Sequence, residues 1–130
     1  MRLMLTFLFA LSLFAADFDW VTNYQQALNL AKKRNKPIMV MISQKNCNMC
    51  EYMDEVTFEN DDVVSFVEVS FIPLKLTLDE AKQVGLKAYG TPTFYFLDKN
   101  GKKLTRALVG AATPKVFLEK IKEIKAKYAH

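Results

Sequence analysis

The chain has 130 residues, of which 51% are hydrophobic and 25% charged. This balance is typical of one globular domain with an apolar core, and the length is too short for two domains of ordinary size. The formal net charge of +4 is spread along the sequence, and no basic run alternates with aromatic residues. The composition therefore disfavours a nucleic-acid-binding surface.

The N-terminal segment differs in composition from the rest of the chain. Arg2 is followed by an almost unbroken apolar run of about 14 residues, whereas a bilayer-spanning helix needs roughly 20. One positive charge, a short apolar run and small residues at its end are typical of a secretory signal peptide. We expect residues 1–16 to be a signal peptide that is cleaved after Ala15 or Ala16, with an uncleaved anchor as the alternative. Residues 17–130 then form the domain.

Hydrophobic periodicity and capping residues predict alternating helices and strands. In chain order, the predicted elements are a helix capped by Thr22 that ends near Asn35, a buried strand over 37–43, a helix over 48–57, a short helix capped by Asp61 or Asp62, a strand over 71–78, a short helix from Asp79 to Gly85, an aromatic strand over 89–98, a strand over 102–109, and a last helix capped by Thr113 with Pro114 at its first position.

The order of these elements predicts an α/β domain. Strand–helix–strand connections favour a mostly parallel sheet, because such crossovers return the chain in the same direction. Asn100-Gly101 is a strong signal for a two-residue hairpin turn, so the strand over 102–109 should add an antiparallel edge. Helices on both faces would bury the sheet.

The two cysteines of the chain, Cys47 and Cys50, lie together in the stretch QKNCNMCEYM. A disulfide stabilises a protein mainly by restricting its unfolded chain. A four-residue loop therefore contributes about 2 kcal/mol, against about 4.7 kcal/mol for a hundred-residue loop. A purely structural role for so short a loop is disfavoured. In an exported protein an even number of cysteines can be oxidised and stay oxidised.

A metal site is a second interpretation of the pair. Structural zinc needs four ligands, whereas one Cys-x-x-Cys supplies two and the only histidine is the terminal His130. Copper(I) fits better, because Met49 and Met53 add two soft donors. Methionines four residues apart on a helix are also typical of core packing. A copper(I) carrier stays open as an alternative.

Redox chemistry is the third interpretation, and it explains the spacing. The pair follows a predicted buried strand and starts a predicted helix, so Cys47 would face the free N–H groups and the positive end of the helix dipole. Both favour a thiolate and lower the pKa of a thiol. We expect Cys47 to be the nucleophile and Cys50, one turn further on, to resolve the mixed disulfide.

Several short motifs occur in the order in which the thioredoxin family carries them. They are CNMC at 47–50, PLKLTLD around Lys75, GTPT at 90–93 with FYFLDKNGK after it, and Val109-Gly110 before the last helix. The sequence therefore resembles the thioredoxin family over roughly residues 18–128. It looks in particular like exported members such as the C-terminal domain of the membrane thiol:disulfide interchange protein.

The resemblance implies a thioredoxin fold, which has a central mixed sheet with helices on both faces. It also implies a cis peptide bond before Pro92, which would pack beside the cysteines and leave the Thr91 backbone free to bind an extended substrate strand. On this reading Cys47 and Cys50 are the catalytic residues, and Thr91 and Pro92 bind the substrate.

The sequence departs from the family pattern in three places, one of them the dipeptide between the cysteines. Asn46 replaces the usual tryptophan before the first cysteine, and Asn-Met replaces Gly-Pro between the two cysteines. Met41 stands where a buried aspartate often helps to deprotonate the resolving thiol, so that role is vacant or filled elsewhere. The acidic residues of the following helix, Asp54 among them, are expected to be solvated, and Lys75 to be a surface lysine at a strand end.

We expect a periplasmic thiol-disulfide oxidoreductase that acts on protein substrates and, from the resemblance, as a reductant. Its partners would be protein thiols and disulfides and an upstream dithiol or disulfide protein that could be membrane-embedded. We expect a monomer, no metal, no nucleic acid, and no organic cofactor, because electrons come from a partner dithiol. The alternatives are the copper(I) carrier and a non-catalytic thioredoxin-like binding module. The direction of electron flow depends on a reduction potential that cannot be read from the sequence.

Overall fold

The computed structural model describes residues 18–128, and the predicted signal peptide lies outside them. Its elements are α1 (Tyr24–Arg34), β1 (Ile38–Ile42), α2 (Asn48–Glu55), the 3₁₀ turn η1 (Thr57–Glu59), α3 (Asp61–Ser70), β2 (Ile72–Leu76), α4 (Leu78–Gln83), β3 (Thr93–Leu97), β4 (Leu108–Val109) and α5 (Pro114–Tyr128). Within the described residues, no helix has the length and apolar character needed to cross a bilayer.

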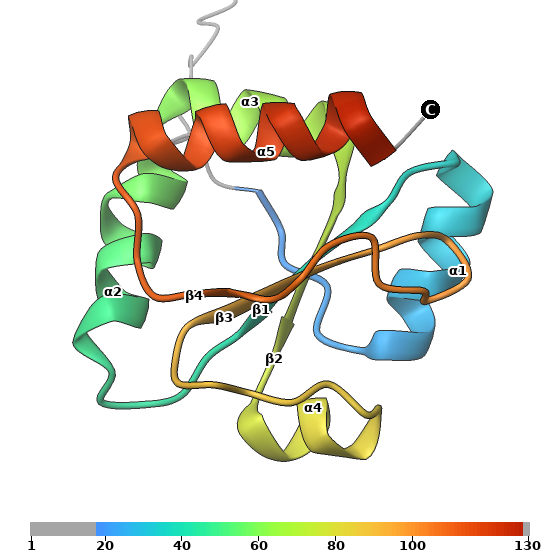
Figure 1. Cartoon of the computed structure of the whole chain (residues 1–130), viewed down its shortest axis with the longest axis horizontal. Coiled ribbons are helices and arrows are strands. Elements are labelled where there is room, and N and C mark those ends of the chain that lie inside the picture. Colours follow the sequence, from blue (N-terminus) through green and yellow to red (C-terminus); the bar gives the residue numbers. More distant parts are fainter. Residues whose placement is uncertain (1–17, 129–130) are drawn as a thin grey trace, which may run out of the picture.

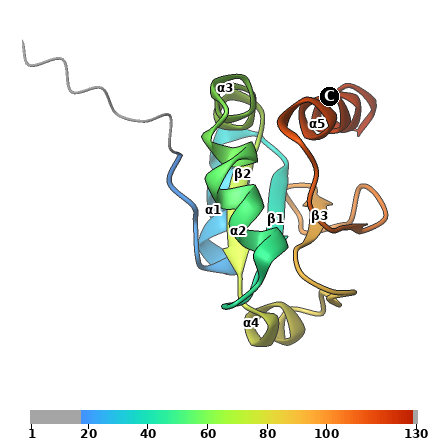
Figure 2. The same ribbon diagram turned by 90° about the vertical axis from the view of Figure 1, so that its left-hand side faces the viewer.

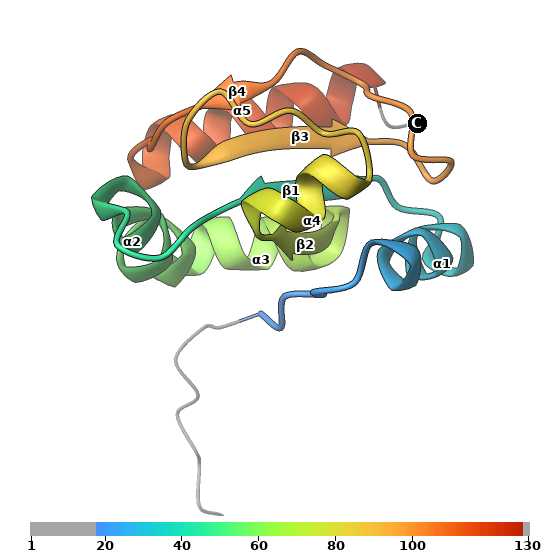
Figure 3. The same cartoon turned by 90° about the horizontal axis from the view of Figure 1, so that it is seen from below.

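The four strands form one mixed sheet in the order β2-β1-β3-β4 (Figure 3). β1 pairs with β2 in parallel, but β3 runs antiparallel to both of its neighbours, β1 and β4. The prediction of a mostly parallel sheet is therefore wrong. The reason is the connection between β2 and β3. The short helix α4 and the loop after it stay at the end of the sheet where β2 finishes, so β3 starts at that same end.

The strand predicted over 102–109 is mostly absent. Lys103 makes a single bridge to Leu97, and only β4 forms a ladder, with Thr93 and Phe94 of β3. The turn is also longer than the predicted two residues. Asp98 and Lys102 close it through a backbone hydrogen bond of 2.8 Å, while the Asp98 carboxylate accepts the N–H groups of Asn100 and Lys102.

Asparagine side chains cap two helices for which other residues were predicted. Asn23, not Thr22, accepts the N–H of Gln26 at the start of α1. Asn60 accepts two N–H groups at the start of α3, and the aspartates that follow occupy the first turn, where negative charge favours the helix dipole. The prediction of Thr113 as the cap of α5 is confirmed by its contact with the Val116 N–H.

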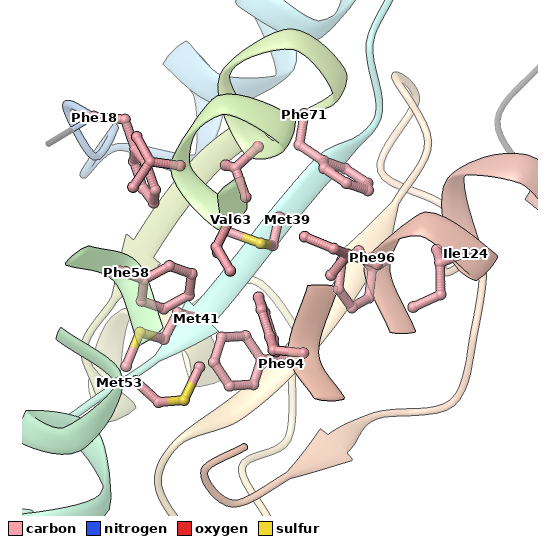
Figure 4. Close-up of a cluster of buried hydrophobic side chains, with 14 of the residues drawn as sticks. Phe18, Met39, Met41, Met53, Phe58, Val63, Phe71, Phe94, Phe96 and Ile124 are labelled. Atoms are coloured by element: carbon pink, nitrogen blue, oxygen red, sulfur yellow. The ribbon is translucent and has the colours of Figure 1, made fainter. Parts of the chain in front are cut away.

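Helices cover both faces of the sheet, as predicted. β1 is buried along its whole length, and its side chains alternate between the two faces. Met39 and Met41 pack with Phe94 and Phe96 under α2, α3 and α5 (Figure 4). The other side chains of β1 pack under α1 and α4. Figures 1 and 2 show α3 and α5 lying side by side across one face.

Phe58 in η1 lies at the centre of an aromatic cluster. Its ring packs edge-on against Phe18, Trp20 and Phe117, with centroids 5.6, 5.1 and 5.3 Å away. A fourth ring, Phe94 of β3, is tilted against it at 6.2 Å. The cluster joins the segment after α2 to the sheet, and Trp20 serves packing as predicted.

Replacing Phe58 with alanine should lower the free energy of unfolding by about 3–5 kcal/mol, the usual cost of emptying an aromatic position in a core. Equilibrium urea denaturation of the oxidised protein measures the loss. Phe66→Ala is the control, because this half-buried ring packs on Phe71 at the edge of the same cluster. Equal losses in the two variants would show that Phe58 is not the centre of the core.

Candidate functional site

A tight turn joins the end of β1 to the start of α2 and carries Cys47 into the N-cap position of that helix. The N–H of Ser43 bonds to the Leu76 carbonyl, which anchors the start of the turn to β2. Asn46 adopts a left-handed backbone conformation with φ of 57°, which asparagine tolerates better than most residues. That requirement gives a physical reason for asparagine at this position.

Cys47 and Cys50 form a disulfide across the first turn of α2, with Cα atoms 5.2 Å apart. The sulfur of Cys47 also accepts the backbone N–H of Cys50 at 3.1 Å, so it caps the helix. Cys47 is 9% exposed, and Cys50 is 2% exposed. An attacking molecule would therefore reach Cys47 more easily than Cys50, although both belong to the same apolar cluster.

The loop before β3 lies against the sulfur of Cys47. The Thr91-Pro92 peptide bond is cis, as the resemblance implied. The Thr91 hydroxyl donates to the Cys47 sulfur at 3.3 Å, and the Thr91 carbonyl oxygen is 3.4 Å from the same atom. The structure thus brings together Cys47, Cys50, Thr91 and Pro92, the four residues named from the sequence.

Thr93 holds this loop in place from inside the protein. Its side chain is fully buried. The hydroxyl accepts the Tyr89 N–H at 3.1 Å and donates to the Gly90 carbonyl at 2.5 Å. On the far side, the Gly110 N–H bonds to the Pro92 carbonyl. The loop is therefore bonded both to Thr93 in β3 and to Gly110 just after β4.

Tyr95 supports the same loop from the opposite face of the sheet. Its hydroxyl donates to the Lys87 carbonyl at 2.5 Å. Burial raises the pKa of Tyr95 above its ordinary value, and the neighbouring Tyr89 phenol adds to the shift. The hydroxyl therefore stays protonated at neutral pH and keeps donating to the loop.

Gln44 reaches the site from the turn after β1, and no sequence signal pointed to it. Its side-chain amide donates to the Thr91 hydroxyl at 2.9 Å, although the two residues are 47 positions apart. Gln44 itself is exposed. A glutamine in a polar turn is typical of a solvated surface, so only the folded arrangement brings it to the loop.

Met41 is a fully buried methionine, so it supplies no acid behind the cysteines. Lys75 pairs with Met41 across the β1–β2 ladder, but its ammonium group forms an ion pair with Asp54 of α2 at 2.8 Å. It also lies 5.1 Å from the Trp20 ring centroid. Lys75 is therefore not a free surface lysine, whereas the Asp54 side chain stays 39% exposed, in line with the expectation of a solvated residue. Asp54 stands four residues, about one helical turn, after Cys50 in α2.

The two methionines near the cysteines do not converge on them. Met49 is 56% exposed, whereas Met53 is fully buried and its sulfur accepts the Ala112 N–H at 3.4 Å. Among residues 18–128 no three histidine, cysteine or acidic side chains cluster as metal ligands. The sulfur of Met53 is thus occupied within the core, which weakens the case for a four-sulfur copper(I) site.

Three segments that carry or border the site bear an exposed apolar side chain. Met49 stands between the two cysteines, and Tyr89, two residues before Thr91, is 58% exposed. Val109, which pairs with Thr93 in the ladder, is 53% exposed. We call Met49, Tyr89 and Val109 the apolar rim.

Comparisons with known proteins agree with this geometry. A family model described as a thioredoxin-like domain matches residues 24–125. The anterior gradient protein 3 of Xenopus tropicalis is 34% identical over 84 residues, which are 63% of this chain and 51% of that protein. The thiol:disulfide interchange protein DsbD of Campylobacter jejuni is 23% identical over 96 residues, which are 69% of this chain and 17% of that protein.

The fold has solved counterparts as well. A thioredoxin from Thermus thermophilus aligns with a TM-score of 0.71 at 24% identity, covering 85% of this chain and 89% of that one. The chain belongs to the thioredoxin-like domain family, and Cys47 and Cys50 are its Cys-x-x-Cys pair. It spans about half the length of the Xenopus relative and less of DsbD.

Thr93→Val keeps the shape of the side chain and removes both hydrogen bonds to the loop. The Tyr89 N–H and the Gly90 carbonyl, whose bonds to Thr93 are part-buried, then lose their partner, so the free energy of unfolding should fall by about 1–3 kcal/mol. Hydrogen exchange of the Tyr89 amide should become faster at the same time. Thr105→Val is the control, because that hydroxyl bonds only to the carbonyl of its neighbour Arg106. If the two variants are equally stable, Thr93 does not hold the loop.

Proposed function

We propose that the protein is a thiol-disulfide oxidoreductase that exchanges disulfides with other proteins. One observation supports this above all. The Cys47 sulfur sits at the N-cap of α2, bonded to Cys50 and facing the Thr91-Pro92 loop. The amide N–H groups and the dipole of α2 favour a thiolate at this position once the disulfide is reduced.

The proposed reaction starts from the reduced pair. The Cys47 thiolate attacks one sulfur of a substrate disulfide, the substrate S–S bond breaks, and the other substrate sulfur leaves as a thiolate that takes up a proton. Cys50 then loses its proton and attacks the Cys47 sulfur, which releases the second substrate thiol and forms the Cys47–Cys50 disulfide. The substrate gains two electrons and the pair loses two. Oxidation of a substrate dithiol is the same sequence in reverse.

A substrate segment would dock along the loop before β3. In this proposal the Thr91 backbone pairs with an extended stretch of the substrate, and Pro92 shapes the groove next to the cysteines. Met49 of the apolar rim, which stands between the two cysteines, would lie next to the reacting sulfurs and help to exclude water from the mixed disulfide. Backbone pairing accepts many sequences, so this surface suits protein substrates of broad sequence.

We further propose that the protein works outside the cytosol as a reductant. The composition of residues 1–16 and the compartments in which disulfides persist support export. The likeness to a thiol:disulfide interchange protein supports an upstream dithiol partner that resupplies electrons. In this proposal the acid absent at Met41 has no assigned replacement, and Cys50 gives its proton to solvent.

Replacing Cys50 with serine should stop the reaction at the mixed disulfide. Incubation of reduced Cys50→Ser protein with a model disulfide peptide should give a covalent adduct through Cys47, detected by mass spectrometry and lost on reduction. The matched variant Cys47→Ser should give little adduct, because Cys50 is nearly inaccessible. An adduct that forms mainly in Cys47→Ser would assign the roles the other way round, and no adduct in either would remove the exchange function.

The reductant role predicts a low reduction potential for the Cys47–Cys50 couple. Equilibration with glutathione or with a reference dithiol should give a value closer to the roughly −270 mV of a thioredoxin than to the roughly −120 mV of a strong periplasmic oxidant. A value near the oxidising end would reverse the direction while leaving the exchange chemistry in place.

A further inference from the structure

Two polar groups of Thr91 contact the Cys47 sulfur, and they favour opposite protonation states. The carbonyl oxygen, at 3.4 Å, accepts hydrogen bonds only, so it favours a protonated thiol that can donate to it. The hydroxyl, at 3.3 Å, can donate its single proton to the sulfur and then favours a thiolate, which only accepts. The direction of that hydroxyl proton therefore decides which state Thr91 stabilises.

Gln44 fixes this direction. Its side-chain nitrogen carries two protons and cannot accept, and it donates to the Thr91 hydroxyl oxygen at 2.9 Å. The Gln44 N–H occupies one lone pair of the Thr91 hydroxyl oxygen, and the hydroxyl proton then points at the Cys47 sulfur. Without Gln44 the hydroxyl could turn toward solvent, and the sulfur would keep the carbonyl as its neighbour but lose its donor.

The turn before α2 carries both partners of the Thr91 hydroxyl, Gln44 and Cys47. Gln44 and Cys47 lie three residues apart on opposite sides of the left-handed Asn46, and both contact Thr91. Gln44 is exposed, so its removal leaves no buried cavity. The charges on the neighbouring segments are Lys45, Glu51, the Asp54–Lys75 ion pair, Glu80, which lines one pocket with Gln44, and Lys87 in the loop before β3. They are the same in every variant proposed below.

We propose that Gln44 is a positioning residue that acts through Thr91. By orienting the Thr91 hydroxyl toward the Cys47 sulfur it stabilises the thiolate and so favours the reduced form of the pair. The inference rests on the proposed exchange function of Cys47, but it concerns a property of the sulfur that can be measured without any substrate.

The test compares single and double variants in a Cys50→Ala background, which leaves one thiol. The alkylation rate of Cys47 by iodoacetamide is measured as a function of pH for the parent and for Gln44→Ala, Thr91→Val and the double variant. In Gln44→Ala the pH midpoint of the Cys47 alkylation profile should rise. At a pH below that midpoint the alkylation rate should then fall about three- to tenfold, where a tenfold fall corresponds to a rise of one pKa unit. Thr91→Val should lower the rate at least as much.

The double variant separates positioning from a merely structural role. If Gln44 acts through the Thr91 hydroxyl, adding Gln44→Ala to Thr91→Val should change nothing further, whereas Thr91→Ser, which keeps the hydroxyl, should preserve the response to Gln44→Ala. Gln25→Ala is the matched control, an exposed glutamine of α1 that bonds only to Asn29 in its own helix. It should leave the alkylation profile unchanged.

A second readout uses the intact cysteine pair. Because Gln44 favours the reduced form, Gln44→Ala should shift the reduction potential of the couple to a more negative value. An unchanged alkylation midpoint in Gln44→Ala, or a full additional effect in the Thr91→Val background, would overturn the inference. The mixed-disulfide experiment on Cys50→Ser would then still stand as the separate test of the exchange function, since that variant retains Gln44.

Discussion

The site depends on one constraint: only five residues separate the end of the buried strand β1 from the start of the helix α2. The first N–H groups of a helix have no partner inside it. In α2 the sulfur of Cys47 supplies one such partner by accepting the Cys50 N–H, where serine or asparagine would do so in other helices. The reactive atom is thus also the structural cap, and it is held at the positive end of the helix by the same bond that starts the helix.

The second half of the site comes from strand pairing. Ile42, the last residue of β1, lies opposite Thr93, the first residue of β3. This register carries the Thr91-Pro92 loop beside the turn that contains Cys47. A shift of one residue would move Phe94 and Phe96 from the cluster under α2, α3 and α5 to the opposite face of the sheet, because side chains alternate along a strand. Packing of these two rings therefore fixes the position of the loop. The aromatic cluster around Phe58 therefore serves the chemistry indirectly.

The sequence predicted the parts of the structure that depend on local patterns. The predicted buried strand is β1, and the predicted helix start at Thr113-Pro114 is the start of α5. The two cysteines lie at the start of a helix, and the Gly-Thr-Pro-Thr motif forms the loop before β3, as expected. The family resemblance supplied the cis bond, which no local pattern of hydrophobic residues could indicate.

The remaining features depend on contacts between distant segments. The direction of β3 follows from where α4 and its loop lie, and not from the strand itself. Gln44 and Asp54 look like solvated residues in the sequence, because their partners, Thr91 and Lys75, come close only when the sheet forms. The asparagine caps were missed for a smaller reason. Each stands beside a residue type that caps equally well, and the choice between neighbours depends on where the backbone bends.

The central claim is that reduction of the pair leaves an ionised sulfur at the start of α2. The most direct measurement is an ultraviolet titration of the Cys47 thiolate in a Cys50→Ala variant. The account predicts a midpoint clearly below the value of about 8.5 for a free cysteine thiol. A midpoint at or above that value would show that neither the helix nor the Thr91 loop stabilises the thiolate, and would contradict the account.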